Sequence, residues 1–471
     1  MICFGFSPGF PLLATRKDEF VGRPVRTSDR APDLVRTQVL PMMTSSTRPR
    51  PDPDSHSTLK QSGKGSALDR YEIDTRVVHG GVHRDEWTTD PLGRSVVNPP
   101  VYRASTVTFP DMATLRYAAA DYPFTGMWYG RHGNPTTFAL EEAFAVLEGA
   151  DNACLTSSGV AAVNASILAF VKSGDHVLIT DACYDPTRSF CDSFLARFGV
   201  TTTYYAPTIS PDDFAALIQD NSVVALVESP ASLSFEVMDI KAISEKAHAR
   251  GLKVIVDNTW GPSLFRPFEH GCDVSINAAT KYLGGHSDLM MGITSARDNE
   301  TYRAIKKSVA QLGCPPGSDD AYLVLRGIRT LRVRLKQHGE TGLILARWLE
   351  SRPEVKRVMH PGLESHPQHE LFRRQFSGSC GLFGLQLVEG FSRKAVDAML
   401  DGMKLFSMGF SWGGFESLIM QTSINSVRTV EKWKYGDGFG QTLRIHAGLE
   451  DVNDLIADLN AGFERLSGHS N

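Results

Sequence analysis

The stretch IKAISEKAHARGLKVIVD, residues 240 to 257, contains one helix–strand unit of the chain. Residues 240–251 carry apolar side chains at helical spacing and end at a glycine, which is typical of an amphipathic helix. The run KVIVD that follows is short, β-branched and apolar, as strands buried on both faces are. A helix that leads directly into a buried strand indicates an α/β sheet.

The same alternation continues through the middle of the chain. Two further buried strands are predicted at 176–180 (HVLIT) and 223–228 (VVALVE), and two amphipathic helices at 161–174 and 212–220. Strands and helices in alternation favour a largely parallel sheet with helices on its faces. We place this α/β domain at residues 134–327.

The C-terminal part has a different pattern. A long helical stretch is predicted at 322–350, an edge or hairpin strand at 381–390, and a closing amphipathic helix at 451–467. Such a mixture predicts a smaller α+β domain, which we place at residues 328–471.

The N-terminal part differs again. Residues 1–70 include TSSTRPRPDPDSHSTLKQSGKGS, which is rich in Ser, Pro and charge and predicts a disordered extension. An organelle transit peptide is an alternative, although the acidic residues argue against it. A start codon at Met42 or Met43 is the third reading. Residues 71–133 form a separate arm before the α/β domain.

Composition and charge exclude several functional classes. The 471 residues carry a net charge of −4, which provides no basic surface for nucleic acid. No apolar run approaches the roughly 20 residues that span a bilayer. The 7 cysteines are scattered, so neither a disulfide framework nor a zinc or other metal site is expected. The sequence predicts a soluble, cytoplasmic protein with free thiols.

Three polar features fall where predicted strands end, which is where ligands collect in open α/β sheets. The turn Ser-Ser-Gly opens a helix, and the N–H groups of Gly159 and Val160 are placed to bind a phosphate. Asp257 ends KVIVD, and a buried acid needs a cationic partner. Lys281 lies among small and apolar residues (NAATKYLGG), where partial desolvation favours the free amine.

Each feature alone has a commoner structural explanation. The turn could be an ordinary helix cap, Asp257 a capping aspartate, and Lys281 a side chain that reaches solvent from a strand edge. Together they provide a Schiff-base lysine, an acid for a pyridine nitrogen and a phosphate site. That combination predicts a pyridoxal 5′-phosphate enzyme.

The stretch DVSINAATKYLGGHSD, residues 273–288, resembles the lysine signature of the Cys/Met-metabolism family of pyridoxal-phosphate enzymes. Residues 129–149 (YGRHGNPTTFALEEAFAVLEG), 411–419 (SWGGFESLI) and 442–451 (TLRIHAGLED) are similar to further landmarks of that family. The resemblance extends from about Thr75 to the end of the chain. It implies the aspartate-aminotransferase fold, fold type I, with a large α/β domain and a smaller C-terminal α+β domain.

The resemblance also implies how the cofactor is held. Lys281 would bind it and move protons, Asp257 would keep its pyridine nitrogen protonated, and Tyr184 would stack on its ring. The residues of the same chain that would contact its phosphate are Gly159, Val160 and Thr280.

Tyr129 and Arg131, from the arm, are similar to family residues that reach the phosphate in the neighbouring subunit. The resemblance therefore implies at least a dimer, and a tetramer as the usual assembly. Arg444 would bind the α-carboxylate of a small amino-acid substrate through its planar fork. Ser411 would help to position the lysine. The catalytic residues implied are Lys281, Tyr129, Tyr184 and Ser411.

The stretch FSMGFSWGGFESL, residues 406–418, favours one branch of the family. γ-Acting relatives carry an acid before Ser411 and a leucine after it, whereas this chain has Phe410 and Trp412. Ser-Trp-Gly-Gly resembles the bacterial type of cystathionine β-lyase, with Trp412 and Ser411 at the substrate. Some β-lyases have tyrosine in place of Phe410.

The branch implies a carbon–sulfur lyase that converts L-cystathionine to homocysteine, pyruvate and ammonia, as in transsulfuration and methionine biosynthesis. Three alternatives stay open: a cysteine or cystine β-lyase, a cystathionine γ-synthase or γ-lyase, and a non-catalytic scaffold of the same fold. The scaffold is disfavoured because Lys281, Asp257 and Arg444 are all present.

Overall fold

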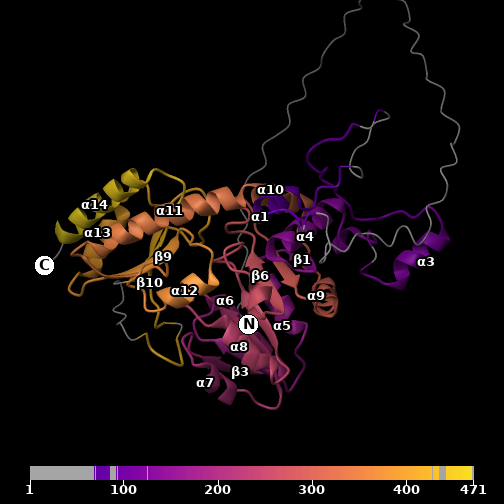
Figure 1. Ribbon diagram of the computed structural model, residues 1–471, viewed down its shortest axis with the longest axis horizontal. Coiled ribbons are helices and arrows are strands. Elements are labelled where there is room, and N and C mark those ends of the chain that lie inside the picture. The colour runs from indigo at the N-terminus through magenta and orange to yellow at the C-terminus, as the bar shows by residue number, and fades with distance from the viewer. Residues whose placement is uncertain are drawn as a thin grey trace, which may run out of the picture. The chain divides into compact units, whose positions relative to one another are not determined.

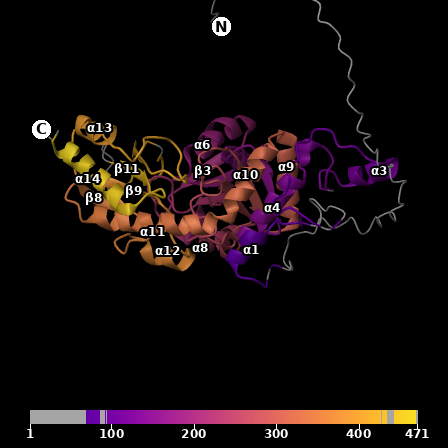
Figure 2. The same cartoon turned by 90° about the horizontal axis from the view of Figure 1, so that it is seen from above.

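A computed structural model describes residues 68, 70–84, 92, 94–124, 126–426, 428–433 and 442–468. Nearly all of the extension predicted at 1–70 lies outside the described residues. The described residues of the arm contain two helices, α1 (Ile73–His79) and α3 (Met112–Ala120), and one 3₁₀ turn, η2 (Gly130–His132). Figures 1 and 2 both show α3 apart from the other labelled helices.

A seven-stranded sheet forms the centre of the large domain, in the order β1-β7-β6-β5-β4-β2-β3. Its neighbouring strands are parallel except where β7 pairs with β1 and β6. The strands are β1 Asn152–Thr156, β2 His176–Thr180, β3 Thr201–Tyr205, β4 Ser222–Glu228, β5 Lys253–Asp257, β6 Val274–Ala278 and β7 Gly292–Ala296. The three strands predicted from apolar runs are β2, β4 and β5. All five residues of β2 are buried, as expected for a strand covered on both faces.

Helices pack on this sheet and connect its strands (Figure 1). They are α4 Pro135–Glu148, α5 Gly159–Leu168, α6 Asp185–Ser189, α7 Pro211–Ala216, α8 Ile240–His248, α9 Asn299–Leu312 and α10 Ser318–Arg329. The short turns are η3 Phe190–Phe194, η4 Leu195–Phe198 and η5 Pro267–His270. The helices predicted at 161–174 and 240–251 are shorter than expected at their C-terminal ends. Their predicted glycine ends, Gly174 and Gly251, instead take φ values of +88° and +76° in the turns that lead into β2 and β5.

The small domain is built on an antiparallel sheet in the order β10-β11-β9-β8. Its strands are β8 Val355–Met359, β9 Leu382–Leu387, β10 Leu418–Thr422 and β11 Thr442–His446, and its helices are α11 Leu331–Glu350, α12 His369–Gln375, α13 Arg393–Asp401 and α14 Val452–Gly468. Figures 1 and 2 show α11 extending from α10 to the small domain, where α14 lies beside α11 and α13 lies beside α14. The helix predicted at 322–350 is therefore two helices, separated at Thr330.

The prediction of an edge or hairpin strand at 381–390 is wrong about its position. β9 pairs with β11 on one side and β8 on the other, and all six of its residues are buried. One face packs on the helices of the small domain through Phe383 and Leu385. The other meets the large domain, where Trp260 donates a hydrogen bond to the carbonyl of Leu382 at 3.1 Å. Because both faces are covered, the strand lacks the polar alternation of an exposed one.

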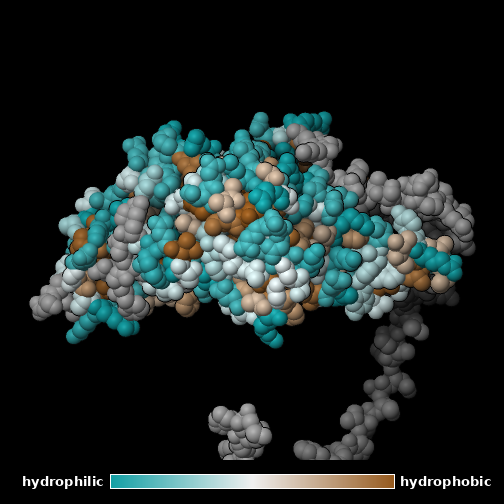
Figure 3. Space-filling model, turned by 90° about the horizontal axis from the view of Figure 1, so that it is seen from below, coloured by the Kyte–Doolittle hydropathy of each residue, from teal (hydrophilic) through white to brown (hydrophobic). Residues whose placement is uncertain are grey.

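Among the described residues, no helix is both long and apolar enough to cross a membrane. The face shown in Figure 3 is mostly hydrophilic, with small apolar patches near its middle.

Candidate active site

Lys281 lies three residues after β6, where the large domain meets the small one. Its Nζ donates a hydrogen bond to Oγ of Ser411 at 2.6 Å and lies 5.1 Å from the ring centroid of Trp412. Both partners belong to the loop before β10. Burial and the nearby charge of Arg444 lower the pKa of Lys281 to about 8, against the opposing effect of Asp257. An appreciable fraction of this amine is therefore unprotonated near neutral pH.

Two carboxyl groups end adjacent parallel strands beside this lysine. Glu228 ends β4, Asp257 ends β5, and the two are in register. Burial raises the pKa of Asp257, even though its Oδ1 accepts a hydrogen bond from the backbone N–H of Thr259 at 3.0 Å. Burial and then the charge of Asp257 raise the pKa of Glu228 to about 8. The ionised form of Asp257 is therefore costly unless a further cation binds there.

Glu228 also fixes the backbone at Tyr184. Its Oε2 accepts a hydrogen bond from the Tyr184 N–H at 2.7 Å, and its Oε1 accepts one from Ser232. Tyr184 immediately precedes α6 and is 46% exposed, so it remains accessible to a ligand. The charges of Asp257 and Arg444 both reach its hydroxyl group.

The Ser-Ser-Gly turn brings the N-terminus of α5 close to the strand that leads to Lys281. Ser158 caps the helix by accepting a hydrogen bond from the Ala161 N–H at 3.1 Å. A Cβ atom at Gly159 would lie only 2.7 Å from Cβ of Ala278, so glycine is required for this close approach. Because the first N–H groups of a helix lack intrahelical partners, Gly159 and Val160 present free donors beside β6.

Thr280 lies at the same edge, directly before Lys281. Its Oγ1 accepts a hydrogen bond from the Met291 N–H at 3.1 Å, which fixes the side chain near the turn. The hydroxyl hydrogen has only a long contact with the Met291 carbonyl, at 3.4 Å. It can therefore donate to an anion instead.

Arg444 enters the site from β11. Its Nη2 donates hydrogen bonds to the carbonyl of Ser411 at 2.9 Å and to Sδ of Met420 at 3.0 Å. Its other guanidinium nitrogens make no hydrogen bond to the described residues, so one edge of the fork can receive a carboxylate. Burial lowers its pKa, and an anionic ligand would offset that cost.

The family model for Cys/Met metabolism PLP-dependent enzymes matches residues 74–464. The chain belongs to this family. It is 43% identical over 409 residues to a putative cystathionine beta-lyase of Rhizobium johnstonii, which covers 86% of this chain and 99% of the relative. It is 40% identical over 398 residues to cystathionine beta-lyase MetC of Escherichia coli, covering 84% and 99%.

Solved structures of the family share the fold. Cystathionine gamma synthase from Xanthomonas oryzae pv. oryzae, crystallised with aminoacrylate and cysteine, is 31% identical and matches with a TM-score of 0.76. The match covers 85% of this chain and 99% of that one. The predicted family and fold class are thus confirmed, and pyridoxal 5′-phosphate is the cofactor of this enzyme.

The residues present fit this cofactor. Lys281 supplies a buried amine of lowered pKa, and Asp257 supplies a buried carboxyl group whose pKa is raised by burial. The close approach at Gly159 leaves helix N–H donors beside them. An aldehyde, a pyridine nitrogen and a phosphate match these three groups in turn.

Tyr129 and Arg131 do not join this group within one chain. Tyr129 is 42% exposed, and its hydroxyl accepts a hydrogen bond from Ser105 at 3.2 Å. Arg131 is exposed and donates to the carbonyl of Ala310. Neither contacts Lys281 among the contacts of the described residues.

Glu228 was missed by the sequence reasoning, which singled out only Asp257 among the strand-ending acids. The signal was available, because VVALVE ends in an acid just as KVIVD does. His446 was also missed, although it lies two residues after Arg444 and so on the same face of β11.

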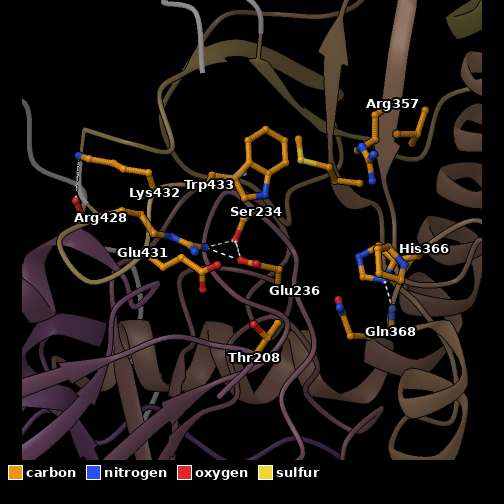
Figure 4. A pocket seen from close by; sticks show the side chains of 13 residues that line it. Thr208, Ser234, Glu236, Arg357, His366, Gln368, Arg428, Glu431, Lys432 and Trp433 are labelled. Atoms are coloured by element: carbon orange, nitrogen blue, oxygen red, sulfur yellow. Dashed lines mark hydrogen bonds and ion pairs between the residues drawn. The ribbon is translucent and has the colours of Figure 1, made fainter. Parts of the chain in front are cut away.

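A second hollow, of about 130 Å³, lies around Arg428, Glu236 and Ser234 (Figure 4). Arg428 is buried and donates to Glu236 and to Ser234. This pairing attaches the chain after β10 to the large domain. Lys432 and Glu431 also line the hollow, and the Nζ of Lys432 donates to the backbone carbonyls of Asn425 and Arg428.

Proposed function

We propose that the enzyme cleaves L-cystathionine by β-elimination and releases homocysteine, pyruvate and ammonia. The observation that carries this proposal is the position of Trp412, 5.1 Å from the amine of Lys281. Trp412 belongs to the segment whose sequence distinguishes β-acting from γ-acting relatives. That segment therefore lies next to the reacting amine of Lys281. Relatives named cystathionine beta-lyase, 40% to 43% identical over most of the chain, support the same substrate.

When bound, the cofactor accepts the electron pair released at the substrate Cα. Lys281 has the reactive amine, which attaches the cofactor, removes the Cα proton and returns a proton to the departing sulfur. Ser411 accepts a hydrogen bond from this amine at 2.6 Å, which orients Nζ for that transfer. Asp257 would hold the proton of the pyridine nitrogen, and Gly159, Val160 and Thr280 would bind the phosphate.

Arg444 orients the substrate in this proposal. The edge of its guanidinium that makes no hydrogen bond to the described residues binds the α-carboxylate, so that Cα is presented to Lys281. Tyr184 covers one face of the cofactor ring, and Trp412 limits the space next to the amine.

Phe410 has a smaller part than its position in the motif suggests. Phe410 is 88% exposed and makes no contact with Lys281 among those of the described residues, unlike Trp412. The hydroxyl that some β-lyases carry at this position is therefore not required for contacts around the amine within one chain.

We further propose a homo-oligomer, tetrameric as is usual in the family, in which Tyr129 and Arg131 complete the phosphate site of the neighbouring subunit. Both residues are exposed, and neither contacts Lys281 among the contacts of the described residues, which supports this assignment. Co-expression of Arg131→Ala and Lys281→Ala subunits tests it. Hybrids would contain one intact site and regain activity; inactive hybrids would place Arg131 in its own subunit's site.

A cytoplasmic location is also part of the proposal. Six cysteines among the described residues are all free, and five of them are buried, which suits a reducing compartment.

The proposed reaction is tested by identifying the products that the purified enzyme forms from L-cystathionine. Pyruvate together with homocysteine is expected. 2-Oxobutyrate together with cysteine would show cleavage at Cγ and would overturn the reading of Trp412. If L-cystathionine is not cleaved while L-cystine yields pyruvate, the β-elimination stands but the substrate is wrong.

A further inference from the structure

Two neighbouring side chains of β11 hold the loop that contacts Lys281. Leu443 and Ile445 face the core of the small domain, so Arg444 and His446 face the large domain. Arg444 Nη2 donates to the carbonyl of Ser411 at 2.9 Å, and Nε2 of His446 lies 3.1 Å from the backbone nitrogen of Gly413. The loop is thus held on both sides of Trp412.

The loop needs such support because its backbone is strained and closely packed. Ser411 has a φ of +81°, a value that residues with a side chain rarely adopt. Gly413 has a φ of +84°, and a Cβ there would lie 3.1 Å from Cα of Lys281 and 2.8 Å from the nitrogen of Tyr282. Any movement of Gly413 would therefore change the surroundings of Lys281 directly.

The hydrogen-bonding role of His446 depends on its tautomer. Its Nε2 lies 3.1 Å from the N–H of Gly413 and also 3.1 Å from the carbonyl of Gly414, and a neutral ring can use only one of these contacts. A buried N–H without a partner is rarer than a carbonyl with a free lone pair. We therefore assign Nε2 as the acceptor for Gly413, which places the ring hydrogen on Nδ1.

His338 presents the complementary tautomer. Its Nδ1 lies 2.8 Å from the carbonyl of Ala447, so Nδ1 carries the hydrogen and Nε2 has a lone pair. The two rings are 5.2 Å apart, and His446 Nδ1 and His338 Nε2 are the nitrogens left without a partner among the described residues. No hydrogen bond joins these two nitrogens, so the two rings are in packing contact only. Burial lowers the pKa of His446 to about 3 and that of His338 to about 4, so both rings are neutral when the enzyme works.

We propose that His446 is a positioning residue, which accepts a hydrogen bond from Gly413 and so holds the Ser411–Trp412 loop against Lys281. His338 packs beside His446, with the ring centroids 5.2 Å apart. Tyr282, next to Lys281, packs on both rings, with centroids 5.2 Å from His338 and 5.8 Å from His446. This inference deepens the proposed function, because it rests on Lys281 as the reacting amine.

A matched pair of substitutions tests the inference in the holoenzyme. The amide oxygen of His446→Gln reaches the position of Nε2 and can still accept from Gly413, whereas the shorter His446→Asn reaches only the position of Nδ1. His360→Gln is the control, because His360 is another buried histidine of the small domain whose Nδ1 accepts a backbone N–H, that of Gly362, at 3.0 Å.

The readouts are the pH midpoint of the cofactor absorbance without substrate, the melting temperature, and kcat and KM. In His446→Asn the loop is held less tightly, so water reaches Lys281 more easily and the charge of Arg444 moves relative to it. The two effects that lower the pKa there are weakened, and the pH midpoint therefore rises by about one unit. The kcat of the same variant falls about 100-fold, because misplacement of the reacting groups costs a factor of about this size. His446→Gln and His360→Gln should keep both values close to those of the unaltered enzyme, whatever their melting temperatures.

An unchanged midpoint and kcat in His446→Asn would overturn the inference. So would equal changes in His360→Gln, since these would reflect general destabilisation. If His446→Asn does not fold, His446→Leu, which has no acceptor for the Gly413 N–H, gives the second test. The same rise of the midpoint is expected, and no rise would overturn the inference. The midpoint is measured without substrate, so a failure of the cystathionine assignment would leave this result intact.

Discussion

Replacing Arg444 by alanine should weaken substrate binding while the cofactor stays bound. Nη2 of Arg444 is committed to Ser411 and Met420, at 2.9 and 3.0 Å, so a substrate carboxylate would bind along the remaining edge of the guanidinium. Removing one member of such a buried charged pair costs about 2–5 kcal/mol. At about 1.4 kcal/mol per factor of ten, KM should rise between about 30-fold and several thousand-fold.

The same substitution should also change Lys281. The positive charge of Arg444 is the second cause, after burial, that lowers the pKa of this lysine to about 8. In Arg444→Ala the pKa should rise, and the pH optimum of kcat with it. Arg444→Lys, which keeps the charge but loses the fork, should raise KM and leave the pH profile nearly unchanged.

The assay is steady-state kinetics on L-cystathionine across pH, with cofactor content measured by absorbance in every variant. A KM of Arg444→Ala within about threefold of the unaltered enzyme would refute the carboxylate role, because the expected minimum loss is ~2 kcal/mol. Loss of the cofactor from this variant would instead place Arg444 among the cofactor ligands.

Three further predictions concern the cofactor and the buried histidines. Lys281→Ala should abolish turnover, and substantial pyruvate release by that variant would remove Lys281 from the mechanism. Gly159→Ala should weaken cofactor binding at least ~10-fold, because its Cβ would lie 2.7 Å from that of Ala278. Equilibrium dialysis measures this, with Gly317→Ala as control, since a Cβ there meets nothing within 4 Å. Burial lowers the pKa of His338, His360, His366 and His446 to between about 3 and 4. Their stabilising contribution is present above the unfolded pKa of ~6.5 and is lost as pH falls, by about 1.4 kcal/mol per pH unit for each histidine. Urea unfolding from pH 6 to pH 4 should therefore show a shallower pH dependence in His360→Gln, and parallel curves would contradict the assignment.

Features that depend on neighbours in sequence could be predicted well. The strand ending in Asp257 and the glycine-led helix at Gly159 are local patterns, because strand burial and helix capping act over a few residues. Lys281 stood out for the same reason, since its own neighbours are small and apolar. The motif around it then identified the family and, with it, the fold.

Features that depend on tertiary pairing could not be predicted in this way. β9 is an interior strand because β11 and β8 pair on either side of it, and no residue within 381–390 reports that pairing. Arg444 and His446 contact the Ser411 loop from a distant part of the sequence. Arg444 and Ser411, for example, are 33 residues apart. The sequence places these residues in motifs, but only the folded chain shows that one strand face holds the loop.

The most direct test of the account is to locate the cofactor on the chain. Borohydride reduction of the holoenzyme attaches the cofactor permanently to its lysine, and peptide mass spectrometry then identifies that residue. The account predicts a single modified lysine, Lys281, and no modification in Lys281→Ala. Attachment to any other lysine, or equal labelling of the variant, would contradict the site described here.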